Sequence, residues 1–232
     1  MSATSNTTPE HDPDTTAPLP HAISPLDQQL ALRAAAERLT MEFTGQHDRE
    51  TVEAYLLTSY DELIPQARLV NFLPLLAERF ARQRLHALAR LEAQHADGKP
   101  VVLFLCTHNA GRSQMALGFF THLAGAGALA WSGGSTPGTE VNPAAVTAMA
   151  ERGIDISAEY PKPWTDEVVR AADVIVTMGC DDVCTVYPGK HYEDWPVADP
   201  EGIDLSGVRA IRDDIERRVR QLVLQLDLPR PG

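Results

Sequence analysis

The sequence of 232 residues has few cysteines and no long hydrophobic run. No apolar stretch approaches the roughly 18 residues that cross a bilayer, so we expect no membrane span. The N-terminus lacks a basic segment followed by an apolar core, so we expect no signal peptide. An odd number of cysteines, three, without an export signal indicates a reducing compartment, the cytoplasm. Any disulfide in this chain is therefore expected to be catalytic rather than structural.

Basic residues are also scarce. Lysine and arginine number 20 against 32 aspartates and glutamates, which gives a net charge of −12 and a pI of about 5.0. A nucleic-acid-binding protein needs a basic face, so this balance argues against that class. A small anionic substrate is still compatible with it, because donors at short range outweigh the screened field of the whole protein.

Composition divides the chain into distinct parts. Residues 1–23 are rich in Thr, Pro and Asp and nearly free of large apolar side chains, which predicts a disordered tail. Residues 24–95 contain three stretches with apolar residues at helical spacing, and we predict a small three-helix bundle domain there. Residues 96–100 are the predicted linker to a second domain, residues 101–232.

The three predicted helices carry start and stop signals. Ser24, followed by a proline, starts the first helix, and Gly45 ends it. Asp48 caps the second helix, and Pro65 interrupts it. The third helix is predicted from about residue 72 to 95.

From residue 101 onward, apolar strands alternate with helices. Predicted strands are 101–105, 128–132, 173–178 and 191–195, and predicted helices are 113–123, 142–152 and 206–226. Continuously apolar strands need cover on both faces, so we predict an α/β fold with a four-stranded parallel sheet flanked by helices. Sheets of this kind bind ligands at the carboxyl ends of their strands.

One loop at such a strand end carries a candidate site. The segment 106–113, Cys-Thr-His-Asn-Ala-Gly-Arg-Ser, follows the first strand and leads into a helix. Backbone N–H groups of such a loop can hold a tetrahedral oxyanion, and Arg112 adds a planar fork for two of its oxygens. The same field stabilises the thiolate of Cys106, a candidate nucleophile. The predicted oxyanion-binding residues are Thr107, His108, Asn109, Ala110, Gly111, Arg112 and Ser113. For His108 the alternative is an exposed position at the rim.

Two further cysteines follow the third strand. Cys180 and Cys184 are four residues apart, so they share a face if the segment is helical. They can exchange with an electrophilic sulfur or form a disulfide with each other. Two alternatives are open: both are small buried side chains, or they bind a metal with His191, although no fourth ligand is evident.

Asp199 is a candidate general acid in the loop after the fourth strand. We expect this loop to lie at the same edge of the sheet as Cys106, where a carboxyl group can protonate a leaving oxygen. The alternative is a turn residue, because Asp before Pro is a common turn starter.

With these residues, the stretch from 101 to 226 resembles the arsenate reductases of the low-molecular-weight tyrosine phosphatase fold, of the thioredoxin-coupled three-cysteine type. The resemblance rests on the segments 106–116, 142–157, 177–184 and 194–200. The preceding helical part resembles a three-helix domain that is fused to some of these enzymes.

The resemblance implies a role in arsenic detoxification and a mechanism. Cys106 attacks arsenate held by the loop and Arg112, while Asp199 protonates the departing hydroxide. Cys180 then attacks Cys106 and arsenite leaves, after which Cys184 attacks Cys180. Thioredoxin reduces the resulting disulfide, and no bound cofactor is implied. Phosphate and sulfate are the expected substrate analogues.

The sequence departs from the family pattern in two places. Some members hold a potassium ion near the loop through carboxylates, but the corresponding positions here are Leu117 and Lys162. We therefore predict no metal site, with the Lys162 ammonium in the place of the cation. The spacing between Cys180 and Cys184 is shorter than in some relatives, so mycothiol is an alternative reductant.

A low-molecular-weight protein tyrosine phosphatase is the nearest alternative function. It uses the same loop and acid but has no use for Cys180 and Cys184. Phosphatases of this fold usually flank the acid with aromatic residues, whereas Asp199 lies next to Ala198 and Pro200. Weak phosphatase activity is expected in either case, because phosphate and arsenate share shape and charge.

A second alternative is an arsenic or redox regulator whose helical part binds DNA or a partner. Four arginines, Arg79, Arg82, Arg84 and Arg90, lie in one predicted helix. We interpret them instead as a solvated face, paired in part with Glu78 and Glu92.

Overall fold

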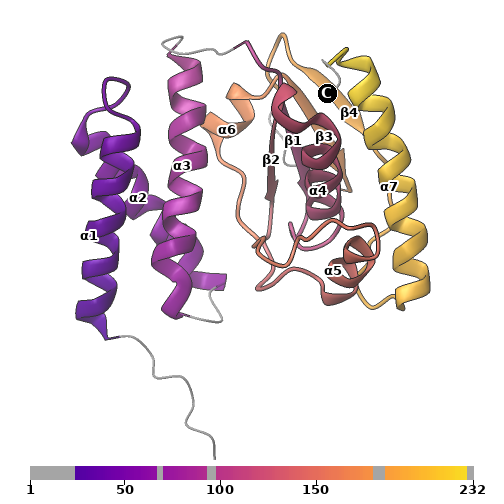
Figure 1. Ribbon diagram of the computed structural model, residues 1–232, viewed down its shortest axis with the longest axis horizontal. Coiled ribbons are helices and arrows are strands. Elements are labelled where there is room, and N and C mark those ends of the chain that lie inside the picture. Colours follow the sequence, from indigo (N-terminus) through magenta and orange to yellow (C-terminus); the bar gives the residue numbers. More distant parts are fainter. Residues whose placement is uncertain (1–23, 67–69, 93–97, 180–185, 229–232) are drawn as a thin grey trace, which may run out of the picture.

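The computed structural model describes residues 24–66, 70–92, 98–179 and 186–228. A group of N-terminal helices is followed by a sheet with helices on both faces (Figure 1). The α-helices are α1 (Pro25–Glu42), α2 (Arg49–Leu63), α3 (Leu73–Leu91), α4 (Arg112–Ala124), α5 (Pro143–Ala150), α6 (Asp166–Ala171) and α7 (Leu205–Gln225). The strands are β1 (Val101–Cys106), β2 (Leu129–Gly134), β3 (Val174–Met178) and β4 (His191–Asp194), and short 3-10 helices are Ile64–Gln66, Val70–Phe72 and Gly125–Gly127.

The four strands form one parallel sheet in the order β2-β1-β3-β4, which confirms the predicted fold class. Cys106 at the end of β1 pairs with Gly134 of β2 and with Met178 of β3. The prediction that the second strand ends at residue 132 is wrong, because β2 continues to Gly134. Gly134 lies so close to the loop that follows β1 that an added Cβ would be 2.7 Å from the Thr107 carbonyl oxygen. A strand can end beside this loop only with a residue that lacks a side chain.

Strand β1 is buried on both faces, and its side chains alternate between two cores. Val102, Phe104 and Cys106 face a core formed with α4, α5 and α7. Val101 and Leu103 face a second core, which includes residues of α3 and α6. Figure 1 shows the same arrangement, with α4 and α7 on one side of the sheet and α3 on the other.

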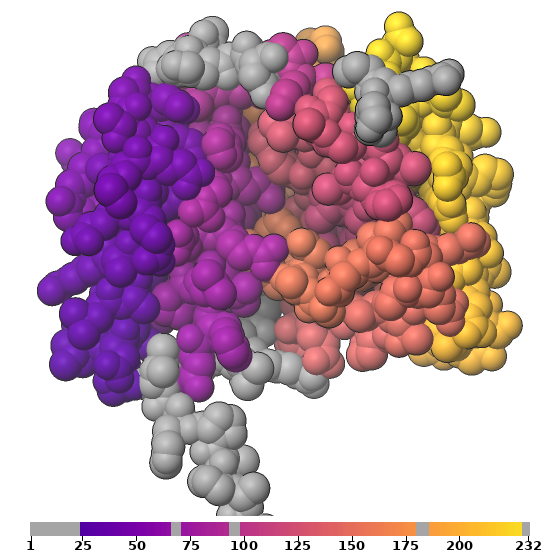
Figure 2. Space-filling model, in the orientation of Figure 1, coloured from indigo at the N-terminus to yellow at the C-terminus, as the bar shows by residue number. Residues whose placement is uncertain are grey.

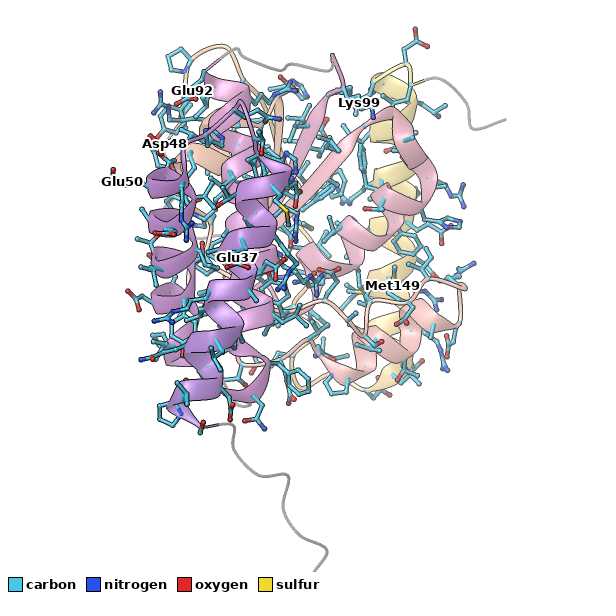
Figure 3. All side chains as sticks on the ribbon, turned by 60° about the vertical axis from the view of Figure 1, so that its left-hand side comes forward. Glu37, Asp48, Glu50, Glu92, Lys99 and Met149 are labelled. Atoms are coloured by element: carbon cyan, nitrogen blue, oxygen red, sulfur yellow. The ribbon has the colours of Figure 1, made fainter. Side chains whose placement is uncertain are left out.

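Helices α1, α2 and α3 pack as a bundle around a separate core, which includes Leu39, Val52 and Phe80. The turn that begins α2 at Asp48 and the end of α3 near Glu92 lie at the same end of this bundle (Figure 3). The predicted third helix extended to residue 95, but α3 ends at Leu91, and residues 93–97 lie outside the described residues.

The predicted helix caps are confirmed. The Ser24 hydroxyl accepts the N–H of Asp27, and the Asp27 side chain accepts the N–H of Ser24, which completes a capping box. Asp48 accepts the N–H of Thr51 at 2.8 Å. Gly45 follows the first helix with a left-handed φ of 81°, a conformation that glycine adopts without strain.

Helix α3 is held to the sheet-containing part by ion pairs. Three of its arginines pair across the interface, at N···O distances of 3.2 Å for Arg79–Glu159, 2.5 Å for Arg84–Glu167 and 2.6 Å for Arg90–Asp173. The interpretation of these arginines as a solvated face is therefore wrong for Arg79, Arg84 and Arg90. The expected pairing with Glu78 is confirmed for Arg82, inside the bundle. Helical periodicity shows which side chains share a face, but not which partner covers that face.

Helix α6 is an element that the sequence pattern did not predict. Its six residues complete fewer than two turns, too few for a helical repeat to register. The predicted tail, residues 1–23, lies outside the described residues, and the predicted domain boundaries stay predictions. Within the described ranges, no helix is long and apolar enough to cross a membrane.

Candidate active site

The loop between β1 and α4, residues 106–112, turns around a buried thiol, and we call it the Cys106 loop. Cys106 is 2% exposed. Asn109 adopts a left-handed φ of 47°, a conformation that asparagine tolerates better than most residues. Gly111 lies against Pro200, so closely that an added Cβ would be 2.5 Å from the proline Cγ. The Asn-Ala-Gly sequence therefore allows both the sharp turn and the close approach of the loop after β4.

A buried chain of polar side chains leads from Asn109 to the thiol. Asn109 and Ser113 are both fully buried. Asn109 Nδ2 donates to Ser113 Oγ at 2.8 Å, and Ser113 Oγ lies 3.0 Å from Cys106 Sγ. Because the serine oxygen already accepts a hydrogen bond from Asn109, its own proton can point toward the sulfur. A hydroxyl group that donates to sulfur stabilises a thiolate.

Arg112, the first residue of α4, reaches the loop that follows β4. Its Nη2 donates to Asp199 Oδ2 at 2.5 Å, and its Nη1 donates to the Val197 carbonyl oxygen at 3.4 Å. The arginine side chain is 8% exposed, whereas that of Asp199 is 41% exposed. Gly179 after β3 has a φ of 67°, and an added Cβ there would lie 2.5 Å from Arg112 Nη1. Two loops at the carboxyl edge of the sheet thus fix the guanidinium group beside a carboxyl group.

Neighbouring segments bind the carbonyl oxygens of the Cys106 loop. The carbonyl oxygens of Thr107, His108 and Ala110 accept N–H groups from residues 136, 138 and 142, at distances of 2.8–2.9 Å. These bonds direct carbonyl oxygens, which repel anions, toward residues 136–142. The His108 ring is 43% exposed and lies 3.6 Å from the Glu201 carboxylate, which is the rim position considered as its alternative.

Lys162 lies buried behind the Cys106 loop, with 3% of its surface exposed. Its backbone N–H donates to Asn109 Oδ1 at 3.0 Å, and its ammonium group donates to Ser132 Oγ at 3.2 Å. The same ammonium lies 4.9 Å from the centre of the Tyr160 ring. Burial lowers the pKa of Lys162 to about 8. Across the described ranges, no group of three or more His, Cys, Asp or Glu side chains is arranged to hold a metal ion.

Comparison with known families accounts for this arrangement. Residues 101–230, more than half of the chain, match the family described as low molecular weight phosphotyrosine protein phosphatase. The chain belongs to this family. Residues 32–89 match a second family, described as the N-terminal domain of protein-tyrosine-phosphatase-like proteins. That match covers most of the three-helix bundle.

Individual relatives of this phosphatase-family chain carry the name arsenate reductase. The glutaredoxin arsenate reductase of Synechocystis is 33% identical over 129 residues, which are 54% of this chain and 97% of the relative. Arsenate reductase 1 of Staphylococcus epidermidis is 38% identical over 126 residues, 52% of this chain and 93% of the relative. These relatives align over nearly their whole length with about half of this chain.

A solved structure is similar over most of the chain. The thioredoxin-dependent arsenate reductase of Corynebacterium glutamicum is 42% identical, with a TM-score of 0.78. The match covers 86% of this chain and 98% of that structure. A match of this extent includes most of the N-terminal helices as well as the phosphatase-family part.

The structure brings together three of the candidate catalytic residues, Cys106, Arg112 and Asp199. Cys180 and Cys184 lie outside the described residues. Two contributors to the site were not predicted, Gln114 and Tyr160. Gln114 follows the predicted loop directly, and that position was the available signal. Tyr160 carried no sequence signal, because its contacts with the bundle and the loop are both long-range.

Proposed function

We propose that this protein reduces arsenate to arsenite through a thiol–disulfide relay in arsenic detoxification. The observation that carries the proposal is the convergence of Cys106, Ser113, Arg112 and Asp199 at one edge of the sheet. A nucleophile, a hydroxyl donor to its sulfur, an oxyanion-binding guanidinium and an acid are the groups this chemistry needs. Similarity to enzymes named arsenate reductase supports this choice of substrate.

The first step forms a covalent bond between sulfur and arsenic. The N–H groups of residues 107–113 and the Arg112 guanidinium hold the oxyanion over the thiolate. The Cys106 thiolate attacks arsenic, and one arsenic–oxygen bond breaks. Asp199, as the general acid, gives a proton to the departing oxygen, which leaves as water. The hydrogen bond between Arg112 and Asp199 keeps this acid next to the bound oxyanion.

The next steps transfer two electrons to arsenic. The Cys180 thiolate attacks the Cys106 sulfur, the sulfur–arsenic bond breaks, and its electron pair stays with arsenic as arsenite. Cys184 then attacks Cys180, which releases Cys106 as a thiolate. Two thiols become one disulfide while arsenic(V) becomes arsenic(III), so the relay needs no bound cofactor.

We assign thioredoxin as the reductant of the Cys180–Cys184 disulfide. The similar structure from C. glutamicum is named thioredoxin-dependent, which supports this assignment. Mycothiol is the alternative. A relay of three free thiols works in a reducing compartment, so we place the enzyme in the cytoplasm.

We further propose that the Lys162 ammonium fills the place that a cation takes in some relatives. Its hydrogen bond to Ser132 and its backbone bond to Asn109 put a positive charge directly behind the Cys106 loop. Leu117 and Lys162 line the same cavity between α3 and α4. A fixed ammonium there supplies charge without a dissociable ion.

The direct test is NADPH consumption by the purified protein with arsenate, thioredoxin and thioredoxin reductase. Cys106→Ser is expected to abolish both this turnover and the hydrolysis of an aryl phosphate. Cys180→Ser is expected to abolish arsenite production, and Cys184→Ser to stop turnover after a single arsenite has been released. Both are expected to leave aryl phosphate hydrolysis intact. If Cys180→Ser still reduced arsenate, the relay would be wrong.

A phosphatase function predicts the opposite pattern. Aryl phosphate hydrolysis would then be fast, and no arsenite would form with thioredoxin or with mycothiol and its redoxin. If arsenite formed with mycothiol and its redoxin but not with thioredoxin, the protein would still be an arsenate reductase. Mycothiol, and not thioredoxin, would then be its reductant.

A further inference from the structure

Residues 158–162 contact both the three-helix bundle and the Cys106 loop. This segment follows α5 and leads toward α6. Figure 2 shows the orange surface of this part of the chain against the purple surface of the bundle. The two sets of contacts are made by adjacent residues, so a shift of one end of the segment moves the other.

On the bundle side, the Tyr160 side chain is part of the bundle core. Its ring packs in the same cluster as Leu73, Ala77 and Phe80, although Tyr160 lies far from them in sequence. Its hydroxyl donates to the Leu76 carbonyl oxygen at 3.2 Å. Because Tyr160 is 8% exposed, removing its ring would leave a cavity between α3 and the rest of the chain.

Arg79 of α3 holds the same segment from the surface. Its Nη1 donates to the Ala158 carbonyl oxygen at 2.6 Å, and its Nη2 donates to Glu159 Oε1 at 3.2 Å. Its guanidinium carbon lies 4.9 Å from the centre of the Tyr160 ring. One arginine of the bundle thus contacts three consecutive residues.

On the loop side, the backbone of the segment binds Asn109 directly and through Gln114. Lys162 N–H donates to Asn109 Oδ1 at 3.0 Å. Gln114 Nε2 lies within hydrogen-bond distance of the Tyr160 carbonyl oxygen, at 3.1 Å, and of Asn109 O and Oδ1, at 3.0 and 3.2 Å. Asn109 in turn donates to the serine next to the thiol.

The NH₂ group of the Gln114 amide has no spare donor. Two N–H protons serve three carbonyl oxygens, and Gln114 Oε1 is buried without a partner among the described residues. The bonds donated by Nε2 therefore set the orientation of the Gln114 side chain. If the Tyr160 carbonyl moves, Gln114 loses the acceptor that ties it to the 158–162 segment, and the amide that contacts Asn109 is no longer held in one orientation.

We propose that Tyr160 is a positioning residue through which the three-helix bundle fixes the conformation of the Cys106 loop. The route runs from the bundle core through the Tyr160 carbonyl and Gln114 to Asn109. The consequence for oxyanion binding rests on the proposed function, whereas the effect on the loop itself does not.

The experiment measures hydrogen exchange of the peptide covering residues 106–115 in the full chain, by mass spectrometry. Tyr160→Ala and Arg79→Gln are expected to speed exchange of this peptide about tenfold, the effect of losing roughly one hydrogen bond. Tyr160→Phe keeps the buried ring and loses only the hydroxyl bond to Leu76, and it is expected to stay within twofold of wild type. Arg79→Gln leaves no cavity, so it gives the result even if Tyr160→Ala does not fold.

Two controls separate positioning from general destabilisation. Arg82→Gln removes an arginine of the same helix that pairs with Glu42 and Glu78 inside the bundle. Leu39→Ala removes a buried side chain of α1 from the bundle core and leaves the hydrogen-bonding groups of Arg79, Tyr160 and Gln114 in place. Both are expected to leave exchange of the loop peptide unchanged under native conditions. Equal exchange in Arg79→Gln and Arg82→Gln, or an equal increase in Leu39→Ala, would overturn the proposal.

A second readout uses protection of Cys106 from iodoacetamide by inorganic phosphate. Tyr160→Ala and Arg79→Gln are expected to raise the half-protecting phosphate concentration about tenfold, and the two controls are not. If phosphate failed to protect the wild-type thiol, the proposed oxyanion site would be wrong. The exchange result would still decide whether the bundle positions the loop.

Discussion

At the scale of single residues, Gly179 controls the position of Arg112. Its left-handed φ and the 2.5 Å distance from an added Cβ to Arg112 Nη1 exclude any side chain. Gly179→Ala is therefore expected to push the guanidinium group away from the Cys106 loop. The loss of one charge-assisted hydrogen bond predicts a rise of about tenfold in the KM for arsenate. Initial rates at varied arsenate concentrations measure this.

Gly153→Ala is the matched control for that variant. Gly153 has a φ of 74°, so alanine there suffers a similar backbone strain, but no atom lies within 4 Å of the added Cβ. Its KM is expected to match wild type even if both variants lose similar thermal stability. An equal rise in KM in both variants would attribute the effect to strain and not to Arg112.

Lys162 gives a prediction on pH dependence. Its pKa is about 8 in the folded protein and 10.5 in the unfolded chain, so the unfolded state binds more protons between these values. The burial cost is therefore present in full below pH 8 and is relieved as pH rises toward 10.5. Lys162→Met is expected to stabilise the protein by about 1–2 kcal/mol at pH 6.5 and by less at pH 9.5.

Urea denaturation of both proteins at the two pH values measures this difference. The methionine variant keeps the backbone hydrogen bond to Asn109, because that bond does not involve the side chain. A gap between variant and wild type that stays constant from pH 6.5 to 9.5 would contradict the burial of a charged ammonium.

The site residues that sequence reasoning found from a single motif act locally, whereas Asp199 was found from the expected edge of the sheet and Lys162 from the family resemblance. Cys106, Arg112 and Ser113 belong to one short loop between a strand and a helix, and the chemistry of that loop is contained in its own residues. The bond from Lys162 to Asn109 spans 53 positions, and that from Tyr160 to Leu76 spans 84. Such contacts depend on how the elements pack, which no local pattern records.

At the scale of elements, strands and long helices were predicted within a few residues, because burial and helical spacing mark them directly. The end of β2 was missed, since two glycines usually indicate a turn. Here they extend the strand, because only glycine fits next to Thr107 and Asn109. The missed α6 is short and packs against α3, so it depends on tertiary contact.

Helices α5 and α7 are joined by an acid-sensitive contact. Glu151, directly after α5, accepts hydrogen bonds from Arg209 at 2.6 Å and from Arg212 at 2.9 Å, both on α7. These hydrogen bonds, that from Arg209 above all, lower the pKa of Glu151 to about 2. Desolvation acts in the opposite direction but is outweighed. The stabilisation is thus present above pH 4.5 and is lost as pH falls toward 2.

Glu151→Gln is expected to unfold at a lower urea concentration than wild type at pH 5.5. The gap between the two midpoints should narrow by pH 3, because the Glu151 carboxylate of the unfolded wild-type chain becomes protonated below pH 4.5 and folding must then release that proton. Glu50→Gln, on an exposed glutamate of α2 (Figure 3), is the control and is expected to match wild type at both pH values. If the difference in urea midpoint were the same at both pH values, the loss of stability would come from the changed shape of the side chain and not from its lost charge.

At the scale of the whole molecule, α3 belongs to two cores at once. Phe80 and Leu85 pack in the core of the bundle, whereas Ala87 packs with Val101 and Leu103 of β1. A helix shared in this way covers one face of the sheet while it completes the bundle (Figure 1). Loss of the bundle therefore exposes apolar surface of the sheet, and this links the stability of the two parts.

This sharing predicts one cooperative unfolding transition for the chain. All three tryptophans, Trp131, Trp164 and Trp195, lie in the sheet-containing part, so fluorescence reports that part alone. Far-UV circular dichroism also reports the helices of the bundle. Leu39→Ala, in the bundle core, is expected to lower the free energy of unfolding measured by fluorescence by about 2–5 kcal/mol, the usual cost of removing a buried leucine side chain.

If fluorescence stayed at the wild-type midpoint while the dichroism signal split into two transitions, the bundle would unfold independently. Coincident shifts in both signals would instead show that the N-terminal helices and the sheet fold as one unit.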